Sequence, residues 1–130
     1  MIVVNFAHPF TQEQYSQIVA LLGERPRLYS VETQADRQEP LAHAAKALVD
    51  AVGLGPSAWQ TEPIVINPPG LAGLATAIMA EIHGRSGYFL PILNIRPIAG
   101  STPTRYEVAE IVNLDAIRQE ARTRRLPRVI

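Results

Sequence analysis

Short apolar runs alternate along the chain with longer segments whose apolar residues recur every three to four positions. The runs cover Ile2 to Phe6, Leu28 to Thr33, Ile64 to Ile66, Tyr88 to Ile95 and Tyr106 to Val112. Each run has the length and composition of a β-strand, and the segments between them have the spacing of amphipathic helices. A strand is followed by a helix three times, and two successive strands and a last helix complete the chain. This order predicts an α/β fold with a mostly parallel sheet.

The helix that follows the first strand is marked at both ends. Thr11 and Gln14 form a capping box, and Gly23 stands where a left-handed residue commonly ends a helix. Further helices are expected from about Pro40 to Val52, from about Leu71 to His83, and from Asn113 or Asp115 to about Arg125. The whole pattern predicts one Rossmann-like domain, with helices on both sheet faces; the two successive strands permit an antiparallel pair at the sheet edge.

Composition narrows the class of protein. With 130 residues, 47% of them apolar, the chain has the length of a single domain, residues 1–130. Twelve basic and twelve acidic side chains cancel, which disfavours DNA or bulk RNA as a partner. No apolar stretch reaches the roughly 20 residues of a membrane span, and the chain begins with strand residues rather than a basic leader. We therefore expect a cytoplasmic protein without a membrane partner.

Two proline-containing segments follow strands directly and precede helices directly. They are His8-Pro9-Phe10-Thr11 and Asn67-Pro68-Pro69-Gly70-Leu71. In parallel sheets the ligand crevice lies at the carboxyl ends of the strands, where helix N-termini present unpaired N–H groups to anions. Gly70 has no side chain, so a ligand can approach the main chain closely there. This pattern predicts a binding site for a negatively charged ligand.

Each segment also has a purely structural interpretation. Pro68, Pro69 and Gly70 are suited to ending a strand and starting a helix. His8 is suited to a surface turn, or to donating to a phosphate, stacking on a base or acting as a general acid or base. The arginines from Arg118 to Arg128 suit a solvated helix end better than a phosphate site, because cations stabilise the C-terminal dipole.

Signatures of other chemistries are missing from the sequence. The segment Gly53-Leu54-Gly55-Pro56 follows a helix, whereas a dinucleotide fingerprint must follow a strand. The three histidines stand on separate elements without metal-ligand spacing, there is no cysteine, and no serine occupies a nucleophile elbow. We therefore expect neither a metal nor another cofactor.

Four segments together resemble the small stand-alone CRISPR-associated proteins of type III systems. These are relatives of the CRISPR-associated Rossmann-fold (CARF) sensor domains and of the ring nucleases. The segments occur in the same order and span nearly the whole chain: Asn5 to Thr11, Asn67 to Leu71, His83 to Gly87 and Tyr106 to Ile111. The first two carry most of the specificity.

The resemblance implies a CARF-like homodimer that binds a cyclic oligoadenylate second messenger, with cyclic tetra-adenylate as the favoured form. Its implied role is to sequester the messenger and damp antiviral signalling. The resemblance also allows the dimers to form larger assemblies on the ligand. The implied ligand-binding residues are His8, Pro9, Phe10, Thr11, Asn67, Pro68, Pro69, Gly70 and Leu71, with Arg85 as a candidate charged clamp.

Two other functions stay open. A ring nuclease would cleave the ring by metal-independent attack of a 2′-hydroxyl, with His8 as its catalytic acid or base. Ala7 stands near where sensor domains place a hydroxyl residue, which favours binding without turnover. Metabolic nucleotide binding by an ordinary α/β enzyme is least favoured, because phosphate-loop and dinucleotide fingerprints are both absent.

Overall fold

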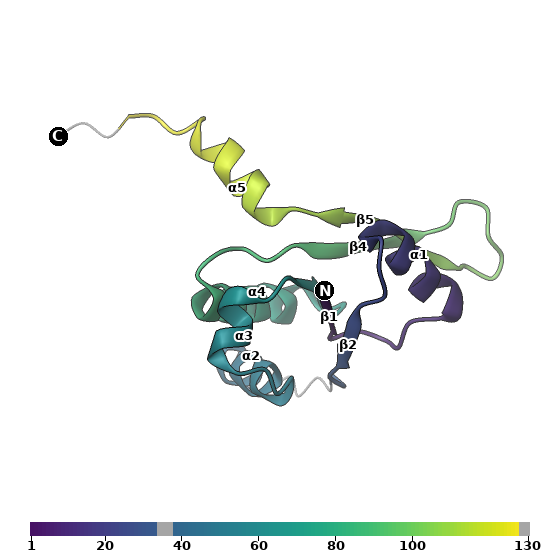
Figure 1. The fold of residues 1–130 in the computed structure, drawn as a ribbon, viewed down its shortest axis with the longest axis horizontal. Helices are drawn as coiled ribbons and strands as arrows, with labels where there is room; N and C mark the ends of the chain where they lie inside the picture. The colour runs from purple at the N-terminus through teal and green to yellow at the C-terminus, as the bar shows by residue number, and fades with distance from the viewer. Residues whose placement is uncertain (34–37, 128–130) are drawn as a thin grey trace.

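A five-stranded sheet forms the centre of the computed structural model, which describes residues 1–33 and 38–127 (Figure 1). Its strands lie in the order β2-β1-β3-β4-β5. The strands are β1 (Ile2–Asn5), β2 (Arg27–Ser30), β3 (Ile64–Asn67), β4 (Ile92–Pro97) and β5 (Tyr106–Val112). The helices are α1 (Gln12–Leu22), α2 (Leu41–Ala51), α3 (Pro56–Thr61), α4 (Ala72–Ser86) and α5 (Leu114–Arg122).

The sheet is parallel apart from one edge pair. β1 pairs in parallel with both β2 and β3, β3 pairs in parallel with β4, and β5 runs antiparallel to β4. The predicted α/β class, with its antiparallel pair at the edge, is confirmed. Because β1 and β3 are neighbours in register, the loops that follow them leave the sheet at adjacent positions.

Both faces of the sheet are covered by helices, as predicted. On one face Ile2, Val4 and Ile66 pack with residues of α2, α3 and α4, and Trp59 is buried among them. On the other face Val3 and Leu93 pack with Ile18 of α1. Residues of opposite parity along each strand therefore fill the two cores, as the period of two in a strand requires.

The ends of α1 agree with the sequence prediction. The Thr11 hydroxyl accepts a hydrogen bond from the backbone N–H of Gln14, and the Gln14 side chain accepts one from the Thr11 backbone. Gly23 is left-handed, with φ of 76°. By contrast, α4 continues past the predicted end at His83 and stops at Gly87, also left-handed. The Gly87 N–H donates to the carbonyl of His83 and closes the last turn, and the buried Ser86 hydroxyl donates to the carbonyl of Tyr88 just past the helix.

The fourth strand is shifted relative to its predicted range of Tyr88 to Ile95. It begins at Ile92, because the chain is still turning out of α4 at Tyr88. It also continues through Arg96 and Pro97, two residues past the predicted end at Ile95. Proline is tolerated there because β3 pairs with β4 only at Ile92, so no strand on that side needs an N–H from Pro97.

The last helix, α5, projects away from the rest of the domain (Figure 1). Asn113 caps it by accepting a hydrogen bond from the N–H of Ala116, as predicted. No residue of α5 is buried, and Ile117 is 56% exposed. Among the described residues, no helix combines the length and apolar character needed to cross a membrane.

Candidate functional site

The loops that follow β1 and β3 are fastened to each other. The backbone N–H of Phe6 donates to the carbonyl of Asn67 at 2.9 Å. Beside this bond, Asn67 Nδ2 donates to Asn5 Oδ1, also at 2.9 Å. Both asparagines are nearly inaccessible to solvent, so neither bond competes with water. The two proline-containing segments of the sequence therefore lie side by side at the carboxyl ends of neighbouring strands.

Asn5 also holds the first loop in shape. Its Oδ1 accepts the backbone N–H of Ala7, and its Nδ2 donates to the carbonyl of His8, each at 2.9 Å. This role of Asn5 was not predicted from the sequence. A signal was present in the sequence, because an asparagine stands at or just after the end of each of the apolar segments of β1 and β3, and a polar residue that closes a buried strand needs a partner.

The segment after β2 is the third wall of the site. The N–H of Val31 donates to the carbonyl of Asn5 at 2.9 Å, and the Thr33 hydroxyl donates to the carbonyl of Phe6 at 2.7 Å. Residues 31–33 are thus fixed to the first loop on both sides of Glu32. The sequence alone did not point to this segment, because nothing in it identifies β2 as the neighbour of β1.

These three segments, with β4 and the start of β5, line a cavity of about 1070 Å³ that is open to solvent on one side. It is lined by Asn5, Phe6, Ala7, His8, Pro9, Phe10, Thr11, Gln14, Ser30, Val31, Glu32, Thr33, Asn67, Pro68, Pro69, Gly70, Leu71, Leu93, Asn94, Ile95 and Tyr106. All of the predicted loop residues are among them. Pockets for drug-sized ligands span roughly 300–1,000 Å³, so this cavity has room for a ligand larger than a mononucleotide.

The N-terminus of α4 opens onto the cavity without a side-chain cap. Its N-cap residue is Leu71, whose side chain has no acceptor, so the first N–H groups of the helix have no partner in the described part of the chain. The N-terminus of α1 differs, because Thr11 caps it. An added Cβ at Gly70 would meet no atom within 4 Å, so the approach to the α4 amides is open.

Few charged groups line the cavity. Within residues 1–33 and 38–127, no lysine or arginine lines it, and Glu32 contributes a carboxylate. His8 is an exposed lining residue whose imidazole can carry a proton, and Tyr106 presents a 53% exposed aromatic ring. The rest of the lining is apolar or neutral. In the described lining, backbone N–H groups and the N-terminal end of the α4 dipole are therefore the main groups suited to an anion.

The structure separates Arg85 from the cavity. Arg85 lies in the last turn of α4, and at a rise of about 1.5 Å per residue that turn is roughly 20 Å from Leu71. Its guanidinium pairs with Asp50 of α2 at 2.8 Å and with Glu81 at 3.3 Å. Hydrogen bonds from Lys46 and Arg85 lower the pKa of the Asp50 carboxyl. Arg85 thus joins α4 to α2 instead of clamping a ligand at the loops.

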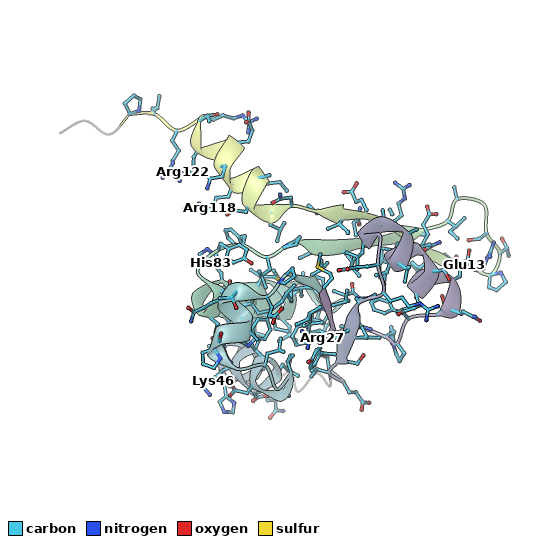
Figure 2. The ribbon with its side chains drawn as sticks, viewed as in Figure 1. Glu13, Arg27, Lys46, His83, Arg118 and Arg122 are labelled. Atoms are coloured by element: carbon cyan, nitrogen blue, oxygen red, sulfur yellow. The ribbon has the colours of Figure 1, made fainter. Side chains whose placement is uncertain are left out.

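The C-terminal arginines also lie away from the cavity. Figure 2 shows Arg118 and Arg122 on α5, on the opposite side of the molecule from Glu13 in the first turn of α1. They are exposed, and Arg124 pairs with Glu120 one turn earlier in the chain. This arrangement agrees with the expectation of a solvated helix end. Arg128 lies outside the described residues.

Comparisons of the chain with protein-family models, with curated proteins and with solved structures found no match. In the described ranges, no three His, Asp or Glu side chains are grouped closely enough to hold a metal ion.

Proposed function

We propose that this protein binds and sequesters a cyclic oligoadenylate, cyclic tetra-adenylate being the favoured form, and so damps type III CRISPR antiviral signalling in the cytoplasm. The observation that carries the proposal is the pair of joined loops around a cavity of about 1070 Å³, with the uncapped N-terminus of α4 at its rim. The nature of the ligand rests on the resemblance of the loop sequences to CARF-related proteins.

The chemistry of the lining supports a ligand that has both phosphates and bases. Unpartnered N–H groups at the start of α4 suit a phosphodiester, which carries a single charge and accepts hydrogen bonds. Phe10 and Tyr106 offer aromatic surface, and Asn94 offers an amide that can pair with a base edge. A ring of four nucleotides repeats both features, so that one ligand can engage several walls of the cavity.

The symmetry of the ligand supports a homodimer. A cyclic tetranucleotide has a two-fold axis, and a two-fold dimer presents the same surface from each subunit. The loop segments lie at the carboxyl ends of the parallel strands. Two copies that face each other at these ends therefore enclose the ring between their cavities. Larger assemblies of such dimers on the ligand belong to the same proposal.

Binding of labelled cyclic tetra-adenylate on a native gel tests this function. We expect the ligand to shift in proportion to the concentration of dimer, and to be recovered intact by chromatography after denaturation. ATP and NAD in excess serve as competitors. Competition by either one at the affinity of the cyclic ligand would contradict the proposal and favour an ordinary nucleotide-binding enzyme.

A ring nuclease is the second candidate, and the position of His8 favours it. His8 lines the cavity and is exposed, and Asn5 fixes its backbone carbonyl. An imidazole at this place is able to take the proton from a ribose 2′-hydroxyl or protonate the leaving oxygen. Glu32 and Tyr106 are further titratable side chains of the lining.

The variant His8→Ala separates the two candidates. If the protein is a ring nuclease, chromatography shows linear products with the unmodified protein, and His8→Ala lowers the cleavage rate about 100-fold or more while binding persists. If it is a binding protein, neither form releases linear products. Cleavage at an unchanged rate in His8→Ala would exclude His8 as the acid or base.

A further inference from the structure

Glu32 is held at the cavity wall by the backbone on either side of it. Val31 donates to the carbonyl of Asn5, and the Thr33 hydroxyl donates to the carbonyl of Phe6. The residue lines the same cavity as the two proline-containing segments, next to the one that follows β1. Since both of its neighbours are tied to the first loop, the main chain of Glu32 is fixed beside the cavity, and its exposed side chain extends from that point.

Within residues 1–33 and 38–127, no counter-ion pairs with this carboxylate. Glu13, Glu24 and Glu62 each pair with a cationic group, whereas no hydrogen bond or ion pair of the described residues involves Glu32. Arginine and lysine are absent from the described lining, and the α4 amides contribute only partial charges. An unpaired carboxylate in the described lining weakens the binding of every anionic ligand, although the rest of that lining is suited to anions.

The unpaired carboxylate repels cyclic and linear nucleotides to different extents, because their phosphates carry different charges. A phosphodiester in a ring carries one negative charge, whereas a terminal phosphate carries about −1.5 to −2 at neutral pH. A carboxylate about 6 Å from a terminal phosphate in water repels it enough to weaken binding about tenfold, and repels a phosphodiester less. A ring has no terminal phosphate, and therefore avoids the larger penalty.

We propose that Glu32 is a specificity-determining residue that excludes nucleotides with terminal phosphates, so that the site selects cyclic over linear oligoadenylates. This inference rests on the proposed function of the same cavity. In this role Glu32 lowers the affinity for competitors such as ATP and linear oligoadenylates, which have the same bases as the cyclic ligand.

The variant Glu32→Gln tests the inference, with binding measured by calorimetry for cyclic tetra-adenylate and for linear tetra-adenylate that carries a 5′-phosphate. At low salt we expect the unmodified protein to prefer the ring, and Glu32→Gln to reduce the ratio of the two dissociation constants about threefold, which is the difference between the repulsion of a terminal phosphate and that of a phosphodiester. Glu32→Asp keeps the charge and should keep most of the preference. Glu110→Gln, on the exposed edge strand β5, is the matched control and should leave the ratio unchanged.

Salt provides a readout that a purely structural role would not change. Raising the ionic strength to about 1 M shortens the Debye length to about 3 Å. This should reduce the preference of the unmodified protein for the ring over the linear ligand. The ratio of the two dissociation constants should stay nearly the same in Glu32→Gln. If the unmodified protein prefers the ring and Glu32→Gln keeps the full preference, the inference is overturned and the proposed function stands. If the unmodified protein binds neither ligand, the proposed function fails and the role of Glu32 fails with it.

Discussion

Replacing Gly70 by valine is expected to weaken binding of cyclic tetra-adenylate at least about 100-fold while the protein still folds. Gly70 precedes the uncapped N-terminus of α4, and a branched side chain there would keep a phosphate away from the α4 amides. Hydrogen bonds to charged groups contribute about 1.5–3 kcal/mol each, so the loss of one or two accounts for this factor. Calorimetric titration of Gly70→Val with the ligand measures the effect.

The fold should tolerate this substitution. A Cβ at Gly70 meets nothing within 4 Å, and the backbone there is not left-handed. Gly84→Val is the matched control, because Gly84 is also exposed with open space around it and lies near the other end of α4. We expect both variants to melt within a few degrees of the unmodified protein. Equal affinity of Gly70→Val and Gly84→Val for the ligand would argue against the proposed phosphate contact.

Replacing Asn5 by leucine is expected to cost about 3 kcal/mol of folding stability and to weaken ligand binding as well. The change removes three hydrogen bonds, to Ala7, His8 and Asn67, and leaves the buried Asn67 amide without its acceptor. A buried polar group that loses its partner costs about 1–3 kcal/mol. For a domain of this size the melting temperature should fall by about 10 °C, which differential scanning calorimetry measures.

A second asparagine provides the comparison for this effect. Asn94 of β4 also lines the cavity and is partly buried, but no hydrogen bond of its side chain is found in the described residues. Asn94→Leu should therefore change the melting temperature by only a few degrees. A melting temperature of Asn5→Leu as high as that of Asn94→Leu would mean that the Asn5 hydrogen bonds do not hold the two loops together.

Local sequence patterns were sufficient to predict most of the helices and strands. The capping box of Thr11 and Gln14 and the left-handed Gly23 depend on residues within one turn of each other, so their chemistry is readable without the fold. The bounds of β4 were not readable in this way. Whether Pro97 ends a strand depends on which neighbour needs its N–H, and that neighbour is set by the strand order.

The part of the candidate site that follows β1 and β3 could be predicted, because its signals are also local in the sequence. The segments after β1 and β3 carry their own signals of proline, glycine and a following helix, and both line the cavity. Arg85 was grouped with them by resemblance, but a helix that returns across a parallel sheet ends at the opposite edge from where it began. Glu32 and Tyr106 carry no local signal, and only strand order brings them to the same rim.

By itself, the sequence determined the α/β class, the parallel core with an antiparallel edge pair, and two proline-containing loops suited to a ligand. These depend on periodicity and on turn chemistry, which act over a few residues. Only the tertiary structure decided that Asn5 joins the two loops, that Glu32 completes the cavity wall and that Arg85 pairs with Asp50. Such contacts join residues far apart in the chain, and their partners are chosen by the order in which the strands pair.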